Sequence, residues 1–349
     1  MTNRLVGRET VKRAGGITGT SADALIDRLI DGASARVCED TGERFIPVTE
    51  TRYYDWPQPE IPVSSYRLYL DAALQSVSAL KTEGGATMIS ADDYFLRPDD
   101  GPPHHRIEID RSSSAILAAG DTSQRAVQVT GDWSRSADTE AAGTVASGLA
   151  DSAEATTCVC SDSSLIDVGH TLLIESERLF VTGRGLSDTT ANLASNIAAN
   201  KAVTTVPVND GSLVKQGEVI TIDSERMLVE DVAGNNLVVQ RGYDGSTLAA
   251  HTSSADVYAP RSLTVERGVN GTTAATHADA TAIAVYVPPQ EVVDLVIAEV
   301  LSGYAQQQSR YGREIGPNGG TSVVNRRELA ALEDAVMRIH MRRDPWTGV

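Results

Sequence analysis

Two histidines, His251 and His277, close two similar runs of sequence, LVVQRGYDGSTLAAH and LTVERGVNGTTAATH. An imidazole can serve as a general base or as a metal ligand near neutral pH. Because the same residue type ends both runs, we interpret it as a constraint shared by two copies of one fold. A role in a turn or in packing follows, rather than a role as one catalytic group.

Two further sets of residues have metal-ligating side chains: Asp99-Asp100 with His104-His105 in the turn RPDDGPPHH, and Cys158 with Cys160 on a predicted strand. A zinc site at the two cysteines would need two more ligands nearby, and the two histidines lie in a Pro/Gly turn whose partners are unspecified. We therefore expect a solvated loop at the histidines and no metal or cofactor. The third cysteine, Cys38, stands alone, so the cysteines indicate a reducing compartment.

The chain carries no nucleophile elbow, metalloprotease motif, Walker A loop or recognisable carboxylate pair. The glycine-bearing segments RGYDG and RGVNG are not phosphate loops, because no strand–loop–helix pattern surrounds them. The sequence therefore predicts no catalytic residue and a protein that is not an enzyme.

An internal repeat organises the middle of the chain. Residues 157–181 and 205–229 align without a gap and share IESERLFV and IDSERMLV. The two runs that end in histidine repeat at a different offset, so the copies are nested rather than tandem. We predict one β-module over 205–260, inserted in a second module formed by 157–181 with 262–287.

The repeat suggests two cross-strand ion pairs, Glu225 with Arg241 and Glu177 with Arg267. On a continuous strand the Ser-Glu-Arg segment alternates between two faces, which places the glutamates on one side. We expect these pairs to be structural. Between the copies, SDTTANLASNIAANKA is predicted to be a polar connecting segment or a short helix.

Helical spacing marks the two ends of the chain. A short helix ends at Gly15-Gly16, a longer amphipathic helix covers 21–39, a proline-led helix follows Pro288, and a last helix begins near Asn325. Between these ends, alternating runs predict a small antiparallel sheet. The residues that we expect to pack between the helices are Leu25, Leu29, Ile30, Val296 and Val300.

Composition separates the acidic middle from its flanks. The chain has a formal net charge of −17, and residues 134–287 hold 9 Lys/Arg against 19 Asp/Glu. This balance argues against broad phosphate binding. The Ala-, Ser- and Gly-rich segment after Ser134 is predicted to be a linker. The expected domains are 1–134, an inserted β-domain over 135–287, and a last part over 288–349.

Several segments together resemble the head-to-tail connector, or adaptor, proteins of long-tailed bacteriophages: TVKRAGGITGTSADALIDRLIDGASARVCEDTGERFIP, LYLDAALQSVSAL, DDYFLRPDDG, AVQVTGDWS and VPPQEVVDLVIAEVL. These contain the Ala33-Ser34 pair, the Arg44-Phe45 step and a V-x-V-x-G-x-W strand. The resemblance covers about Glu9 to Ser134 and Pro288 to Tyr311. In the usual pattern a short loop joins GDW to the proline-led helix, whereas here residues 135–287 intervene.

The resemblance implies an α+β fold, with a helical connector core and a small antiparallel sheet, to which the nested all-β domain and a C-terminal helix and tail are added. It implies a structural virion neck protein, made in the host cytoplasm, that forms a ring under the portal, commonly a dodecamer. Double-stranded DNA would pass through without sequence-specific binding, and no membrane is involved. The portal would be contacted by the C-terminal arm, with candidates Arg342, Arg343, Pro345 and Trp346.

Other functions stay open from the sequence. The nested β-domain could bind carbohydrate or protein on a phage particle, and the chain could be another neck protein, such as a head-closure or tail-terminator protein. A wall-degrading virion enzyme is a third reading, which rests on scattered histidines and carboxylates. The helical ends favour the adaptor, whose next partner would be a head-closure or tail protein.

Overall fold

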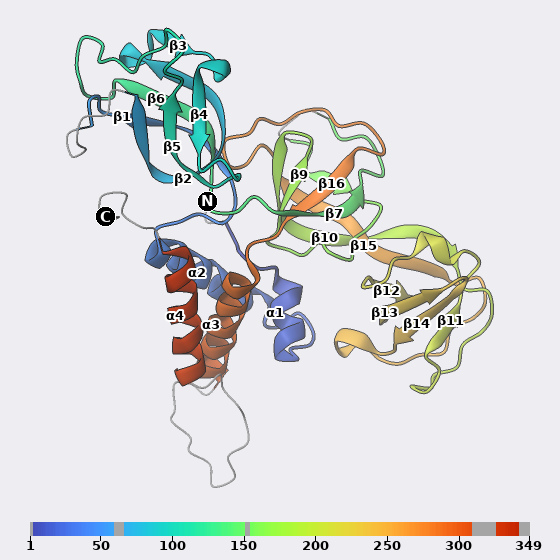
Figure 1. Cartoon of the computed structure of the whole chain (residues 1–349). Helices are drawn as coiled ribbons and strands as arrows, with labels where there is room; N and C mark the ends of the chain where they lie inside the picture. Colours follow the sequence, from blue (N-terminus) through green and yellow to red (C-terminus); the bar gives the residue numbers. More distant parts are fainter. Residues whose placement is uncertain (1–2, 59–65, 151–153, 309–325, 342–349) are drawn as a thin grey trace. The chain divides into compact units, whose positions relative to one another are not determined.

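The structure is a computed structural model that describes residues 3–58, 66–150, 154–308 and 326–341 (Figure 1). Over these ranges the helices are α1 (Arg8–Gly15), α2 (Asp23–Thr41), α3 (Gln290–Gln308) and α4 (Arg326–His340). The strands form two antiparallel sheets, of six and ten strands. The expected helical core with a small sheet is therefore wrong, because most described elements are strands. None of the described helices is both long and apolar enough to cross a membrane.

The chain divides into two compact units. Unit 1 comprises Met1–Ser34, Thr139–Tyr286 and Val296–Asn325, and unit 2 comprises Ala35–Asp138, Val287–Leu295 and Arg326–Val349. Unit 1 thus combines most of the segment predicted as an insertion with the first helix of the chain. Both α2 and α3 contribute residues to each unit.

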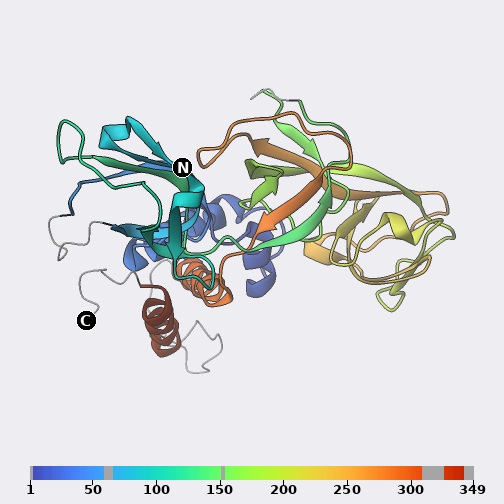
Figure 2. The same ribbon diagram turned by 45° about the horizontal axis from the view of Figure 1, so that its top comes forward.

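Unit 2 is built on the six-stranded sheet, seen from two directions in Figures 1 and 2. Its strand order is β1-β6-β2-β5-β4, with β3 paired to β2. The strands are β1 (Val48–Tyr54), β2 (Arg67–Thr82), β3 (Thr87–Ile89), β4 (Tyr94–Arg97), β5 (His104–Ile109) and β6 (Val127–Trp133). Apolar side chains at alternate positions, such as Val127, Val129 and Trp133 on β6, are buried in one core.

The glycine of the V-x-V-x-G-x-W strand has a steric cause. β2 and β6 shift register on either side of the Ser76–Asp132 and Val77–Gly131 pairs, so β2 bulges towards its neighbour. A Cβ on Gly131 would come 2.0 Å from the carbonyl oxygen of Ser76. The strand can therefore carry only a hydrogen at this position without moving the backbone of β2.

We expect Gly131→Ala to lower the free energy of unfolding by roughly 1–3 kcal/mol, because the new methyl group overpacks a central strand. Urea denaturation of the full chain measures the change. Gly32→Ala is the matched control, since nothing lies within 4 Å of that position on α2. There, alanine should be neutral or slightly stabilising. Equal destabilisation by both variants would contradict the steric explanation.

Unit 1 is built on the ten-stranded sheet, in the order β11-β14-β13-β12-β15-β10-β9-β16-β7, with β8 paired to β15. Its strands are β7 (Thr139–Thr144), β8 (Thr157–Val159), β9 (Thr171–Ile174), β10 (Glu177–Asn192), β11 (Thr205–Pro207), β12 (Val219–Ile222), β13 (Glu225–Ala233), β14 (Asn236–Gln240), β15 (Asp256–Glu266) and β16 (Ala282–Tyr286). The two longest, β10 and β15, pair with each other through three register shifts.

Two copies of one six-strand module lie within this sheet. Module 1 has the order β8, the second half of β15, the first half of β10, β9, β16, β7; module 2 has β11, β14, β13, β12, the first half of β15, the second half of β10. Strand pairs in the two modules are related by the same offsets as the sequence repeats. The pair Phe180–Glu266 in module 1, for example, corresponds to Leu228–Gln240 in module 2. The β10–β15 ladder therefore runs through both modules and joins them.

Two predictions of irregular structure were wrong. The supposed linker after Ser134 contains β7, which pairs with β16, and residues 187–192 of the supposed connecting segment SDTTANLASNIAANKA belong to β10. The isolated bridges Val145–Cys160 and Leu193–Val208 occupy equivalent places in the two modules. The two segments are thus copies of each other, and their small residues fill the first strand of each module.

The Ser-Glu-Arg segment also differs from its prediction as one strand. It forms a tight hairpin, in which Ile174 pairs with Glu177, and Ile222 with Glu225, across two-residue turns. Glu175 and Asp223 hold left-handed backbone angles, with φ of 54° and 53°. This turn lacks glycine, so the usual sequence signal for a hairpin was missing.

Within unit 1, α2 and α3 are in contact. A Cβ on Gly303 of α3 would lie 3.1 Å from Leu29 of α2, so the helices approach closely at this glycine. Of the residues predicted to pack here, Ile30, Val296 and Val300 are buried, whereas Leu25 and Leu29 are half-buried.

Candidate functional site

Each module of unit 1 is centred on a buried glutamate–arginine pair. Arg241 places Nε 2.7 Å from Oε1 and Nη2 2.8 Å from Oε2 of Glu225, and both side chains have 0% exposure. The backbone N–H groups of Gly242 and Ala249 donate to the same carboxylate. Arg267 and Glu177 repeat the geometry in module 1, at 2.7 and 2.8 Å.

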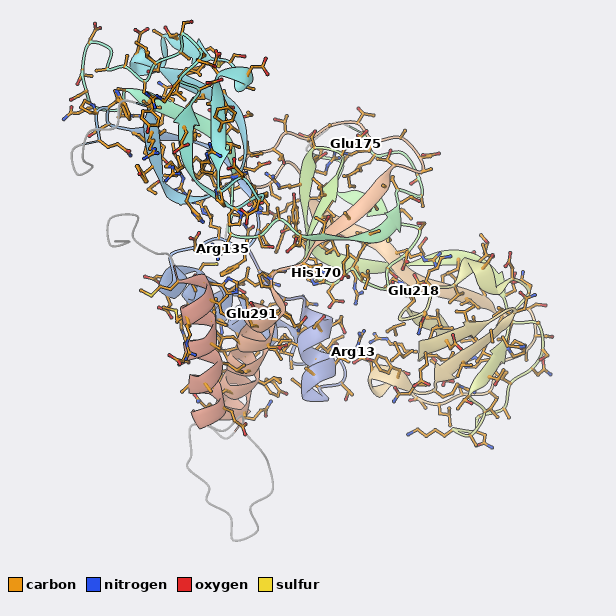
Figure 3. All side chains as sticks on the ribbon, in the orientation of Figure 1. Arg13, Arg135, His170, Glu175, Glu218 and Glu291 are labelled. Atoms are coloured by element: carbon orange, nitrogen blue, oxygen red, sulfur yellow. The ribbon has the colours of Figure 1, made fainter. Side chains whose placement is uncertain are left out.

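The repeated histidines complete these clusters. His251 places Nε2 2.9 Å from Glu225 and Nδ1 2.6 Å from Asp223, an exposed residue of the hairpin turn. His277 makes the equivalent contacts with Glu177 and with Glu175, the residue that Figure 3 labels. Each imidazole thus lies between two carboxylates, one buried and one exposed.

The surroundings keep both buried glutamates ionised. Burial alone would raise the pKa of Glu225, but hydrogen bonds from Arg241, the Ala249 amide, His251 and the Gly242 amide together lower it from 4.5 to about 2. The equivalent donors of module 1, from Arg267, Ala275, His277 and Gly268, lower the pKa of Glu177 to about 2. These clusters hold the loop after each hairpin against it, which is a structural role.

We expect unit 1 to lose stability in acid. The folded-state pKa is depressed, so the stabilisation is complete above about pH 4.5 and is lost as pH falls to about 2, by on the order of 3 kcal/mol per glutamate. Glu225→Gln should cost roughly 3–5 kcal/mol at pH 7, because Arg241 stays buried without a charged partner. Chemical denaturation at several pH values measures both effects.

The matched control for this variant is Asp223→Asn, on the exposed carboxylate of the same cluster. It should cost about 1 kcal/mol or less. A Glu225→Gln protein whose stability falls as steeply between pH 4.5 and 2 as that of the unchanged chain would contradict the role of this carboxylate.

A third buried carboxylate joins the two modules. Glu218 of module 2 (Figure 3) accepts from Arg261 Nε and Nη2 at 2.8 and 2.7 Å. It also accepts from the backbone and hydroxyl of Ser163, in module 1, at 3.0 and 2.9 Å. Since Glu218 is buried and multiply bonded, it fixes one module against the other.

Module 1 also caps helix α1. The N-cap residue Gly7 has no side chain, and Asp167 takes its place by accepting from the amide and hydroxyl of Thr10 at 2.9 and 2.8 Å. The Arg8 amide donates to the carbonyl oxygen of Val168 at 3.0 Å. A Cβ on Gly7 would lie 2.2 Å from Asp167, so glycine permits this approach.

The environment of Asp167 keeps its carboxylate charged. Burial would raise its pKa, but His170, Arg184 and the hydrogen bonds from Thr10 hold the pKa below its usual value. A charged carboxylate at a helix N-terminus is favoured by the helix dipole.

We expect Asp167→Ala to destabilise α1 by about 1–2 kcal/mol, since its first-turn donors lose their cap. Amide hydrogen exchange over residues 8–15 measures this local loss. The control is Lys215→Ala, at the equivalent position of module 2, which should leave exchange in α1 unchanged. Unchanged protection of α1 in the Asp167 variant would contradict the capping role.

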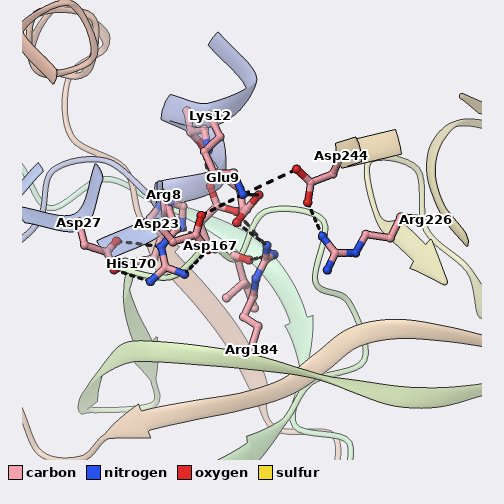
Figure 4. A network of polar contacts seen from close by, with 12 residues as sticks. Arg8, Glu9, Lys12, Asp23, Asp27, Asp167, His170, Arg184, Arg226 and Asp244 are labelled. Atoms are coloured by element: carbon pink, nitrogen blue, oxygen red, sulfur yellow. Dashed lines mark hydrogen bonds and ion pairs between the residues drawn. The ribbon is translucent and has the colours of Figure 1, made fainter. Parts of the chain in front are cut away.

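Basic residues of the N-terminal segment pair with one stripe of α2. Arg4 contacts Asp27 and Asp31, and Arg8 contacts Asp23 and Asp27. The three aspartates are four residues apart and so share one helix face. This arrangement fixes α1 to α2 (Figure 4).

A polar cleft of about 540 Å³ opens between α1 and the two modules. Lys12 is 3% exposed beside it, with Nζ 3.1 Å from Asp23 and 3.7 Å from Asp244 of module 2 (Figure 4). Asp244 also accepts from the Gly19 amide at 2.9 Å and pairs with Arg226. The cleft is therefore walled by charges that already pair with one another.

Glu9 is less well paired than its neighbours in this cleft. Its carboxylate lies 3.8 Å from Lys12 and 3.9 Å from Arg184, beyond hydrogen-bonding distance. Burial raises the pKa of Glu9, and these two cations only partly oppose it. The arrangement can hold α1 in place.

The portal-binding candidates Arg342, Arg343, Pro345 and Trp346 fall outside the described residues. His104 is bonded through Nδ1 to the Pro98 carbonyl oxygen. Cys158 and Cys160 are buried free thiols, and burial raises their pKa values to about 11 and about 12. Among the described residues no His, Cys, Asp or Glu cluster is arranged to hold a metal.

Sequence reasoning missed Asp167, Asp244, Glu218 and Lys12. A signal for the first two was available, because they stand where the copies differ: Asp167 is matched by Lys215, and Asp244 by Asn270. Positions that differ within an otherwise repeated framework are candidates for contacts that one copy alone makes.

No protein-family model matches this chain, and no curated protein matches it either. A functional class must therefore be argued from the residues and their geometry.

Proposed function

We propose that the chain is a structural protein of the bacteriophage neck, a head-to-tail adaptor. It assembles as a ring, with a dodecamer as the expected size, under the portal protein. The ring lets DNA pass and offers a docking surface to a head-closure or tail protein. The proposal includes no catalysis and places the protein in the virion.

The observation that supports this proposal best is the way in which the long insertion begins and ends. The Val287 amide donates to the Asp138 carbonyl oxygen at 2.9 Å, and Thr139 pairs with Tyr286 in the β7–β16 ladder. The two ends of the insertion are thus adjacent, and the chain leaves unit 2 and returns to it at the same place. Without the insertion, β6 would be followed closely by α3, as in the connector pattern.

The order of the remaining elements also fits that pattern. Helices α1 and α2 come first, the strands β1–β6 follow, and α3 begins directly after Pro288-Pro289. The six-stranded sheet is larger than the pattern implies. The order of elements therefore supports the proposal, whereas the size of the sheet does not.

The decisive experiment is electron microscopy of the purified chain mixed with portal-bearing capsids, with its mass in solution measured separately. We expect a ring at the portal vertex. A protein that leaves portal vertices bare but binds tail tips or cell-wall sugar would overturn the adaptor.

A deletion variant tests whether the insertion contributes to assembly of the ring. Replacing residues 139–286 by a short Gly-Ser loop joins Asp138 to Val287, which already lie within hydrogen-bonding distance. Ring formation by this variant would show that the modules are not needed for assembly. Loss of the ring in a variant that still folds would show that the modules contribute a contact to assembly. Circular dichroism of the variant distinguishes loss of assembly from loss of folding.

A second candidate function is surface binding by the β-modules. The polar cleft beside α1 is the observation that favours it, since its volume would admit a small polar ligand. Against it, the cleft's charged groups other than Glu9, such as Lys12, Asp23, Arg226 and Asp244, are already paired with one another. Binding of carbohydrate to capsid-free protein in a glycan array would favour this candidate over the adaptor.

A further inference from the structure

One face of the unit 2 sheet gathers arginines and aromatic rings. We call it the arginine face; its members are Arg67 and Tyr69 on β2, Phe95 and Arg97 on β4, and Arg106 and Glu108 on β5. Because side chains alternate along a strand, the residues between them, such as Leu68 and Ile107, face the buried core. The arginine face is thus the side of these three strands away from that core.

Three guanidinium groups share one carboxylate on this face. Arg67 Nε and Arg106 Nη2 lie 2.8 and 3.0 Å from Oε1 of Glu108, and Arg97 Nε lies 3.0 Å from Oε2. Burial would raise the pKa of Glu108, but the hydrogen bond from Arg97 and the charges of the arginines lower it. Arg97 has a second partner in Asp99. The face keeps an excess of positive charge on a chain of net charge −17.

The arginine side chains are held in place and still reach solvent. Their exposed fractions are 37% for Arg67, 29% for Arg97 and 32% for Arg106. Each stacks on a ring: Arg97 on Phe95 at 5.4 Å, Arg106 on Tyr69 at 5.6 Å, and Arg67 on Tyr66 at 4.9 Å. Stacking holds a guanidinium without using its N–H groups, so those that do not face Glu108 or Asp99 can meet a further anion at a small cost in entropy.

Strand β4 forms the edge of the sheet beside these arginines. The Ile109 amide donates towards β2, to Tyr66, whereas the Asp110 amide donates to Asp93, towards β4. By the antiparallel alternation, Phe95 and Arg97 bond to β5, and the backbone groups of Tyr94 and Leu96 point outwards. Among the described residues no further strand pairs there, so this edge can accept one.

We propose that the β4 edge and the arginine face together bind an extended acidic segment of a partner protein. The segment adds as a strand beside β4, and its alternate carboxylates face Arg97 on β4 and extend towards Arg106 on β5. Main-chain bonds supply affinity, and charge-assisted arginine–carboxylate contacts select acidic side chains. This inference stands whether or not the chain belongs to a phage neck.

Nucleic acid fits the same surface less well. Bases bind by stacking on open aromatic faces, whereas Phe95, Tyr69 and Tyr66 already carry guanidinium groups. A nucleic acid would also leave the outward backbone groups of β4 unpaired, whereas an added strand would pair them.

The test measures binding of a fluorescent eight-residue peptide of alternating Thr and Glu to the full chain by anisotropy. Arg106→Ala leaves Glu108 with two arginines and should weaken binding about tenfold. Leu96→Pro removes an N–H that points away from β5 and leaves the β4–β5 hydrogen bonds in place. This variant should also weaken peptide binding about tenfold. The matched control is Arg125→Ala, which removes an arginine that stacks on Tyr53 elsewhere in unit 2 and should leave affinity unchanged.

Thermal unfolding of each variant checks that it folds. If Leu96→Pro does not fold, two other measurements test the proposal. Arg106→Ala should weaken binding of the peptide, and a peptide with Lys in place of Glu should not bind the unchanged chain. Peptide affinity that is equal in all variants would overturn the proposal. So would a thymidine oligonucleotide that binds through Arg106 in place of the peptide. Self-association that Arg106→Ala disrupts, without peptide binding, would assign the face to a second copy of the chain and would also overturn it.

Discussion

A glutamate with no access to water, held by five donors, is the interaction on which the β part of this chain depends. Glu225 binds Arg241, the amides of Gly242 and Ala249, and His251. These donors come from the end of β14 and the loop after it, so one carboxylate fastens that loop to the hairpin. Because Glu225 and Arg241 are buried, removal of either side chain would leave the other charge buried without a partner. Both modules therefore keep the whole set.

The framework was easier to predict than the contacts made with it. Repeated residues revealed the nested modules and the pairing of Glu177 with Arg267, because the same chemistry had to appear twice. The fold class failed because short strands of Ala, Ser and Thr, such as β7, lack the large apolar residues that mark a strand. Asp167 could not be found from local pattern, since it caps a helix that lies 157 positions earlier.

The two modules have diverged where they meet the N-terminal helix. Asp167 of module 1 caps α1, and the residue at that position in module 2 is Lys215. Asp244 of module 2 faces Lys12, and module 1 has Asn270 there. A duplicated framework thus acquired two different contacts with one helix. Function in this unit is expected at such differences, since the repeated residues are committed to holding the fold.

Nesting imposes an order on how the chain can acquire its structure during synthesis. Module 2 has all its strands once residue 260 has emerged, whereas module 1 needs β16, which ends at Tyr286, to pair with β9 and β7. The inner module can thus fold first and bring the two halves of the outer module together. By closing the long loop between β10 and β15, it lowers the entropy that the outer module must lose. Module 2, once folded, thus favours the folding of module 1.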